Sequence, residues 1–153
     1  MDMKLTAGEI CNRKVTVAHK STALNEAARL MREQHVGSLV VVEETGDGLI
    51  VVGMLTDRDI VTAVVAKDVN PGHLRVDDVM GREVITARDD ASVLDLLASM
   101  RRESVRRIPV VGPKGQLIGL VAADDPMGLI ADELHTLVQA LVSQPRREQQ
   151  ARP

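Results

Sequence analysis

Residues 15–42, VTVAHKSTALNEAARLMREQHVGSLVVV, return without a gap as residues 84–111, VITARDDASVLDLLASMRRESVRRIPVV. The two segments are offset by 69 positions and share seven identical residues. After a turn that is three residues longer in the first copy, the copies resume as GMLTDRD (53–59) and GLVAADD (119–125). Internal repeats set the architecture before any single element does. The chain is therefore a tandem duplication.

Each copy predicts the order strand, helix, strand, turn, strand, helix. Apolar residues recur at helical spacing after the first strand, at Leu24, Ala27, Ala28 and Met31 and again at Val93, Leu96, Leu97 and Met100. Gly37 is the expected end of the first of these helices. The runs SLVVV (38–42) and IPVV (108–111) are strands that pair back with LIVVGML (49–55) and LIGLV (117–121) as hairpins. A helix over about 58–66 closes the first copy.

The composition limits the classes of partner. The chain has 153 residues, an apolar fraction of 44%, a formal net charge of −3, and no Phe, Trp or Tyr. Aliphatic residues and methionine must therefore form the core. Bases have no aromatic side chain on which to stack, and a polyanion meets no overall positive charge. Both facts disfavour nucleic acid as a partner.

The N-terminal sequence favours a cytoplasmic protein. MDMKLTAGEICNRK carries charged and polar residues where a signal peptide needs an apolar run, and no segment reaches the roughly 18 apolar residues of a membrane span. We therefore expect no membrane association. Cys11 is the single cysteine, so it forms no disulfide within the chain and is expected to be a free thiol.

The segment GMLTDRDI (53–60) concentrates polar groups between two apolar runs. Thr56 and Asp59 have the spacing of a capping box, in which the two side chains satisfy backbone N–H groups at the start of a helix. The same N–H groups and the helix dipole also attract phosphate. The pattern therefore fits a cap, an anion site, or both at once.

The ordered double occurrence of these motifs resembles a tandem pair of cystathionine beta-synthase (CBS) domains, also called a Bateman module. The matching motifs are EAARLMREQHVGSLVVV with GMLTDRDI, and LDLLASMRRESVRRIPVV with GLVAADD. The resemblance implies an α/β fold of the α+β kind. Two βαββα repeats would pack as one pseudo-two-fold module, and a C-terminal helix would follow. It also implies two clefts for adenosine-containing ligands, and a sensor without enzymatic activity.

The expected boundaries follow the repeats. The first repeat is expected over 8–68, a linker over 69–75, the second repeat over 76–130, a C-terminal helical extension over 131–143, and a disordered tail over 144–153.

The family pattern assigns the first cleft residue by residue. The Thr or Ser that opens the last helix typically bonds a phosphate, and the Asp three residues later holds the ribose hydroxyls. Thr56 and Asp59 match these positions. The adenine would then lie against the second copy, at Arg82, Ile85, Val105 and Arg106. Because the chain has no aromatic residue, aliphatic side chains must pack against the faces of the base, and backbone groups must form the hydrogen bonds that recognise it.

The second cleft departs from the pattern. Ala122 stands where the first copy has Thr56, so the phosphate hydroxyl is missing, and Asp124 adds a carboxylate nearby. Asp125, the counterpart of Asp59, precedes Pro126 and is also explained as a helix cap. Thr16, Val36 and Arg107 are the other expected contacts of this cleft. We therefore expect unequal clefts, with the Thr56 cleft the stronger.

Other polar groups predict no catalytic or metal site. The four histidines and Cys11 lack metal-ligand spacing, and His35, near a helix end, needs no special role. The paired aspartates lie at expected turns and helix starts, where carboxylates act as caps. No motif brings together a nucleophile, a base and an orienting residue.

The segment after the second repeat predicts an amphipathic helix with one apolar stripe at heptad-like spacing, Met127, Ile130, Leu134, Leu137, Val138 and Leu141. This helix could lie on its own module or meet a symmetry mate. Because it extends beyond its counterpart in the first copy, we expect a homodimer.

Two functions follow from these expectations. In the first, the protein is a stand-alone regulatory module that binds AMP, ATP, NAD or a similar adenosine-containing molecule, needs no obligatory cofactor or metal, and acts on an unidentified protein partner. In the second, it is a stress-associated protein-interaction dimer whose ligand clefts are vestigial.

Overall fold

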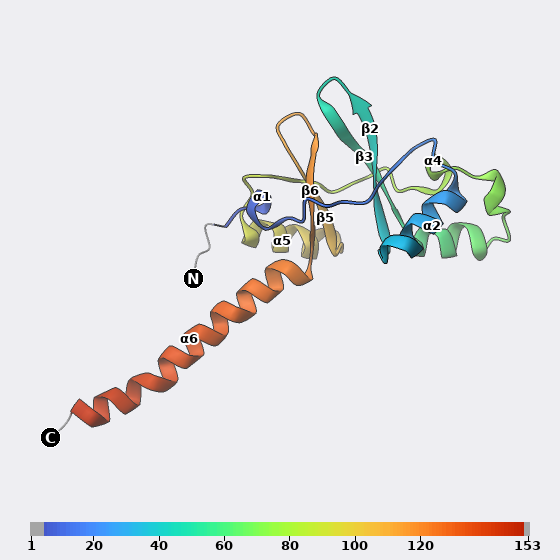
Figure 1. Ribbon diagram of the computed structural model, residues 1–153. Coiled ribbons are helices and arrows are strands. Elements are labelled where there is room, and N and C mark those ends of the chain that lie inside the picture. The colour runs from blue at the N-terminus through green and yellow to red at the C-terminus, as the bar shows by residue number, and fades with distance from the viewer. Residues whose placement is uncertain (1–4, 152–153) are drawn as a thin grey trace.

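The two repeats form two three-stranded sheets that lie next to each other at the centre of the molecule (Figure 1). The computed structural model describes residues 5–151, without the side chains of residues 124–126 and 143–151. The strand orders are β1-β2-β3 and β4-β5-β6. The mixed α+β fold with two sheets confirms the predicted fold class.

The first repeat contributes β1 (Val17–His19), α2 (Leu24–Gln34), β2 (Ser38–Thr45), β3 (Gly48–Thr56), α3 (Asp57–Ile60) and the π-helical turn η1 (Val61–Val65). The connection holds a short 3-10 helix η2 (Pro71–His73) and α4 (Val76–Val79). The second repeat contributes β4 (Ala87–Arg88), α5 (Val93–Glu103), β5 (Arg107–Val111), β6 (Leu117–Ala122) and the long helix α6 (Asp124–Ala151).

Both sheets have the same pairing. The first strand of each repeat is parallel to the second. The second and third strands form an antiparallel hairpin, as the sequence predicts. The register of each hairpin shifts at equivalent positions, between Val41 and Val42 and between Val110 and Val111. The duplication therefore extends to a local irregularity of the sheet.

The end of α2 differs from the expectation. The left-handed residue that ends this helix is His35, with φ 54°, and not Gly37. Its counterpart Ser104 ends α5 in the same way, with φ 53°. Glycine is the commonest residue in this conformation, but His is also enriched there among the other residues, and the side chains of His35 and Ser104 are both exposed.

The leading segment of each repeat pairs with the sheet of the other repeat. Next to the helix α1 (Ala7–Ile10), the N–H and carbonyl of Asn12 are hydrogen-bonded to Leu120 of β6, at 2.9 Å in both directions. The equivalent Gly81 pairs with Met54 of β3, at 2.9 and 3.0 Å. The leading segment of the first repeat thus extends the second sheet, and the leading segment of the second repeat extends the first. This exchange joins the two repeats into one module.

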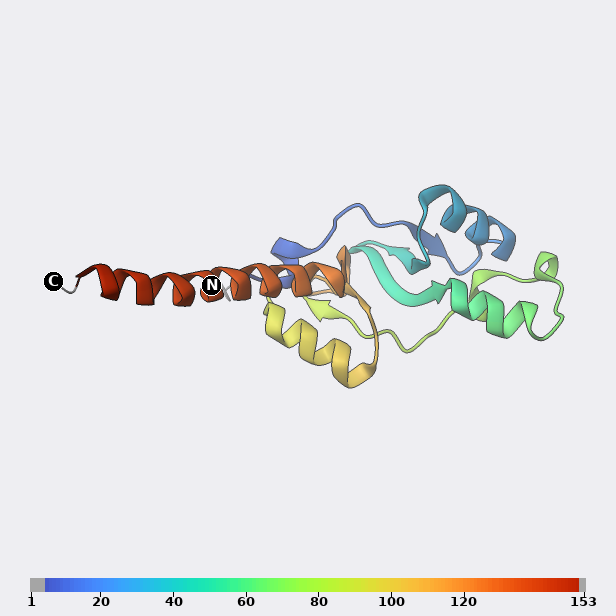
Figure 2. The same cartoon turned by 90° about the horizontal axis from the view of Figure 1, so that it is seen from below.

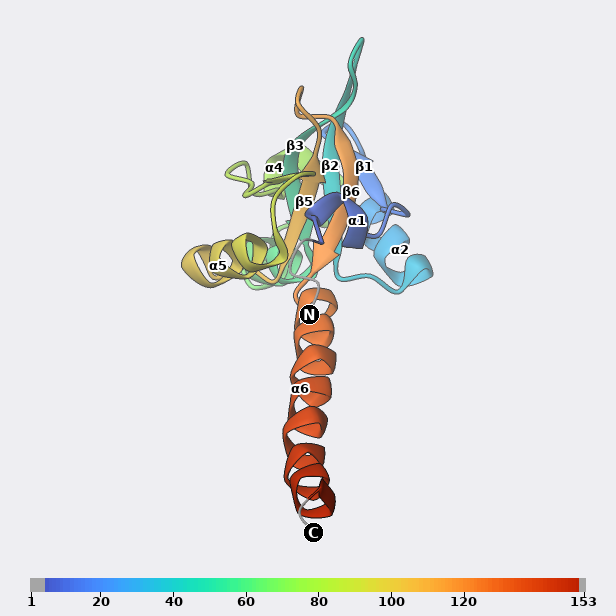
Figure 3. The same ribbon diagram turned by 90° about the vertical axis from the view of Figure 1, so that its left-hand side faces the viewer.

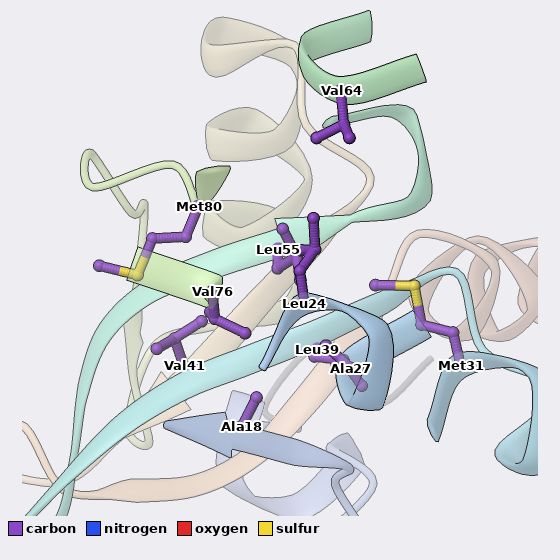
Figure 4. Close-up of a cluster of buried hydrophobic side chains, with 10 residues drawn as sticks. All are labelled: Ala18, Leu24, Ala27, Met31, Leu39, Val41, Leu55, Val64, Val76 and Met80. Carbon is purple, nitrogen blue, oxygen red and sulfur yellow. The ribbon is translucent and has the colours of Figure 1, made fainter. Parts of the chain in front are cut away.

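The core is aliphatic, as the composition predicts. Figure 4 shows the cluster of the first repeat, in which Leu39 and Leu55 of the sheet face Leu24 and Ala27 of α2. Val76 of α4 joins the same cluster, and Ala7 of α1 joins the cluster of the second repeat around Leu96 and Ile108. The exchanged segments are therefore part of each core and not only of the sheet edges.

Two equivalent glycines permit this exchange. A Cβ atom on Gly53 would lie 2.8 Å from the carbonyl oxygen of Gly81, and one on Gly119 would lie 2.8 Å from the carbonyl oxygen of Asn12. Because backbone atoms cannot move aside cheaply, we expect Gly53→Ala to lower the free energy of unfolding by about 1–3 kcal/mol. Urea denaturation measures this change. Gly46→Ala is the matched control, since no atom lies within 4 Å there; an equal effect of both variants would contradict the explanation.

Helix α6 projects from the module in all three views (Figures 1, 2 and 3). It is 28 residues long, so residues 144–151 are helical where the sequence predicts a disordered tail. The Arg, Glu, Gln and Ala residues of this segment favour a helix, and they continue α6 past Pro145. Residues 152 and 153 lie outside the described residues. No helix in the described part of the chain combines the length and the apolar character needed to span a bilayer.

Candidate functional site

The first cleft is a cavity of about 260 Å³ between the end of β3 and the leading segment of the second repeat. It is lined by Ser38, Met54, Thr56, Gly81, Glu83, Val84, Ile85, Val105, Arg106 and Arg107. Four of the residues expected here, Thr56, Ile85, Val105 and Arg106, lie together on its walls. Both repeats contribute, so the cleft exists only in the assembled pair.

Thr56 and Asp59 form a complete capping box at the start of α3. The Thr56 hydroxyl oxygen accepts from the N–H of Asp59 at 3.1 Å, and Oδ2 of Asp59 accepts from the N–H of Thr56 at 3.0 Å. Thr56 lines the cavity, whereas Asp59 lies one helical turn behind it and is half-buried. The capping interpretation of GMLTDRDI is thus confirmed.

Arg82 lies beside the first cleft but does not line it. Its Nη2 donates to Oδ1 of Asp77 at 2.6 Å and to the carbonyl oxygen of Asp77 at 3.1 Å. The neighbouring residues Gly81 and Glu83 line the cavity instead. The ion pair with Asp77 therefore holds this guanidinium beside the C-terminal end of α4 and outside the lining of the cavity.

Ser38, Met54 and Glu83 also line the first cleft, although the sequence pattern does not predict them there. Ser38 is 6% exposed and pairs with Thr56 across the hairpin. Its counterpart Arg107 pairs in the same way with Ala122. The register of the two hairpins, which follows from the repeat, is the signal that would have found Ser38.

The second cleft is a cavity of about 320 Å³ on the pseudo-symmetric side. Its lining residues are Asn12, Lys14, Val15, Thr16, His35, Val36, Gly37, Ser38, Arg107, Leu120 and Ala122. Thr16, Val36 and Arg107 thus lie where the sequence predicts, while the side chain of Asp125 lies outside the described residues. Ser38 and Arg107 line both cavities, so they separate the two clefts.

The two clefts differ in charge at equivalent positions. Lys14 lines the second cleft, and Glu83, 69 residues later, lines the first. His35 also lines the second cleft, although its place near a helix end predicts no special role for it. The second cleft therefore carries more positive charge among its described lining residues than the first.

The described residues contain no group of three or more His, Cys, Asp or Glu side chains that could hold a metal ion. Cys11 is a half-buried free thiol beside β6, and its Sγ lies 3.5 Å from the carbonyl oxygen of Gly8.

Two proteins with similar sequences differ in length: one is longer than this chain, and the other has nearly the same length. An uncharacterized protein of Methanopyrus kandleri is 34% identical over 121 residues, which cover 79% of this chain and 60% of that protein. Hypoxic response protein 1 of Mycobacterium tuberculosis is 34% identical over 136 residues, which cover 88% of this chain and 90% of that protein. The chain thus spans about three-fifths of the first relative and most of the second.

A solved structure with the same fold holds ligands. The CBS domain pair of protein MJ0100, in complex with 5'-methylthioadenosine and S-adenosyl-L-methionine, has a TM-score of 0.72 and 26% identity. The match covers 84% of this chain and 97% of that one. The family model described as CBS domain matches this chain twice, at residues 7–66 and 76–132. The chain therefore belongs to the CBS domain family and contains one tandem pair of these domains.

Proposed function

We propose that this CBS pair is a regulatory module that binds an adenosine-containing ligand, such as AMP, ATP or NAD, and transmits its presence to a protein partner. The observation that carries the proposal is the first cleft, in which aliphatic walls from both repeats meet the polar end of β3. The adenosine-containing ligands of the similar MJ0100 pair support the same ligand class. The module acts as a sensor and not as a catalyst.

The walls of the first cleft suit a purine base. Ile85 and Val105 are half-buried on the second repeat, and Met54 faces the cavity from β3. A flat base between such side chains removes apolar surface from water, which stabilises the complex by about 25 cal/mol per Å² of apolar area. Backbone groups of Glu83 and Val84, which line the cavity, can then bond the base edge.

The capping box leaves both of its side chains able to bind a ligand. In the cap, the Thr56 hydroxyl uses only an acceptor position, so its O–H can still donate to a phosphate oxygen. Asp59 uses one lone pair of Oδ2 for the cap and keeps the other carboxylate positions for ribose hydroxyls. Capping and ligand binding are therefore compatible at this site.

A thermal-shift series with AMP, ATP, NAD, S-adenosylmethionine and adenosine tests the proposal, with guanosine and cytidine monophosphate as controls. A compound that binds only the folded protein adds about 2.7 kcal/mol of stability at 100 times its Kd. We expect at least one adenosine compound to raise the melting temperature and the controls to leave it unchanged. A dimer that responds to none of them would favour the stress-associated interaction protein with vestigial clefts.

We infer that a second copy of the chain covers the apolar stripe of α6. Met127, Leu134, Leu137, Val138 and Leu141 are 45–59% exposed along this helix. Together with Ile130, all of them except Val138 follow the alternating three- and four-residue spacing of a coiled-coil seam. The helix projects from the module, so no other element of the described chain packs along the stripe (Figure 3). An identical helix has the matching period and apolar face.

A further inference from the structure

The large apolar residues of α6 lie only in the part of the helix next to the module. The helix runs from Asp124 to Ala151, and its exposed large apolar side chains begin at Met127 and end at Val142. Residues 143–151 contain no Val, Leu, Ile or Met. The helix therefore has an apolar part, residues 127–142, followed by a polar part, residues 143–151. This order along the axis distinguishes the two directions in which a second copy of α6 can pack.

An antiparallel partner that matches the two apolar parts would extend into the module. In such a pair, Met127 lies level with Leu141 of the second copy, and Asp124 lies level with residue 144. Residues 145–151 of the second copy, about 10 Å of helix, would then run past the start of α6. Figure 3 shows that the module spreads to both sides of this point, with α5 on one side and α2 on the other. The module thus opposes this arrangement.

An antiparallel partner that avoids the module must shift toward the polar part. When Asp124 lies level with Ala151 of the second copy, Met127 and Ile130 lie level with residues of the polar part. These two side chains would lose their apolar partners, which is unfavourable in proportion to the apolar area left in water. A parallel partner in register avoids both problems, because it matches each apolar part with its equal and leaves both modules at the same end.

We propose that the α6 helices of two chains pair in parallel and in register. This inference rests on the pairing of α6 in the proposed function and adds its direction. Packed helices have axes up to about 10 Å apart, so the two modules begin side by side at one end of the pair. The polar parts of both helices lie together at the other end, remote from the modules. A protein partner therefore meets two modules on one side and a double polar helix end on the other.

Cysteine cross-linking of the full chain tests the direction. In a Cys11→Ser background, Met127→Cys and Leu141→Cys each place one thiol on the stripe, where the replaced side chains are 56% and 59% exposed in the single chain. A parallel pair brings each thiol opposite its own copy, within the roughly 7 Å between Cα atoms that a disulfide requires. At about 10 µM protein we expect each variant to link to itself about 100-fold faster than by collision, because pairing gives an effective concentration of about 1 mM. Gln139→Cys, exposed outside the stripe, measures the rate of collision.

The outcomes separate the direction of pairing from the pairing itself. In an antiparallel pair with matched apolar parts, the two copies of residue 127 lie about 20 Å apart along the axis, and only Met127→Cys with Leu141→Cys can link. Co-expression of these two variants, one with a size tag, detects that mixed product. The mixed product would overturn the parallel direction. A dimer in which neither variant links to itself faster than Gln139→Cys would overturn it too. A monomeric wild type in the ultracentrifuge would overturn the pairing of α6, whatever the clefts bind.

Discussion

Replacing Leu134 and Leu137 together by glutamate is expected to convert the protein from a dimer into monomers. Both side chains are more than half exposed in the single chain, at 58% and 57%, and they occupy the centre of the apolar stripe of α6. In a helix pair, each glutamate would be buried against a like charge and an apolar surface, which costs several kcal/mol for each ion. Light scattering and analytical ultracentrifugation measure the mass.

The matched control places two glutamates on the same helix but outside the stripe. His135 and Gln139 are exposed residues of α6, and His135→Glu with Gln139→Glu should leave the dimer intact. A monomeric wild type would disprove the pairing of α6. So would a dimer that survives the Leu134→Glu and Leu137→Glu changes, because another surface would then hold the two chains together.

Asp59→Ala is expected to weaken AMP or ATP binding at the first cleft by roughly 1.5–3 kcal/mol, from the loss of a charged acceptor for the ribose hydroxyls. This change corresponds to about a 10- to 150-fold rise in Kd. The variant also loses the cap bond to the N–H of Thr56, so its stability must be measured beside its affinity. Calorimetry gives the affinity, and urea denaturation gives the stability.

Two variants separate ligand binding from capping. Asp78 accepts from the N–H of Arg75 at 2.9 Å, so Asp78→Ala removes an equivalent cap at α4, outside the lining of both clefts. It should lower stability without weakening AMP binding. Asp59→Asn keeps an oxygen acceptor for the cap while losing the charge. If Asp59→Ala and Asp78→Ala have the same effect on affinity, Asp59 acts only as a cap.

The repeat explains why so much of the fold could be predicted. A constant offset fixes two equal sets of elements, and the apolar runs at 38–42 and 108–111 are β-branched and end at turn residues, so their hairpins follow from local chemistry. The pseudo-symmetry then places residues of one copy opposite the cleft of the other. For this reason the sequence predicts that Thr56, Ile85 and Val105 share one cavity, as they do in the structure, although they are up to 49 positions apart.

The remaining features depend on tertiary structure. The leading segment of the first repeat pairs with the second sheet through backbone hydrogen bonds between Asn12 and Leu120. Backbone hydrogen bonds do not depend on side-chain type, so the sequence shows no pattern that would predict them. The sequence predicts Arg82 beside the base, whereas in the structure its guanidinium forms an ion pair with Asp77 outside the cavity lining. α2 ends at His35 in a left-handed turn, and His35 lines the second cleft. The apolar pattern of a helix does not determine the exact residue at which the helix ends.

The most direct test of ligand binding is a crystal structure of the protein with AMP. We expect the adenine between Ile85 and Val105, the ribose hydroxyls within hydrogen-bond distance of Asp59, and a phosphate oxygen within hydrogen-bond distance of the Thr56 hydroxyl. AMP bound away from both cavities, or crystals grown in saturating AMP with both cavities empty, would contradict the assignment of this CBS pair as an adenosine-ligand sensor.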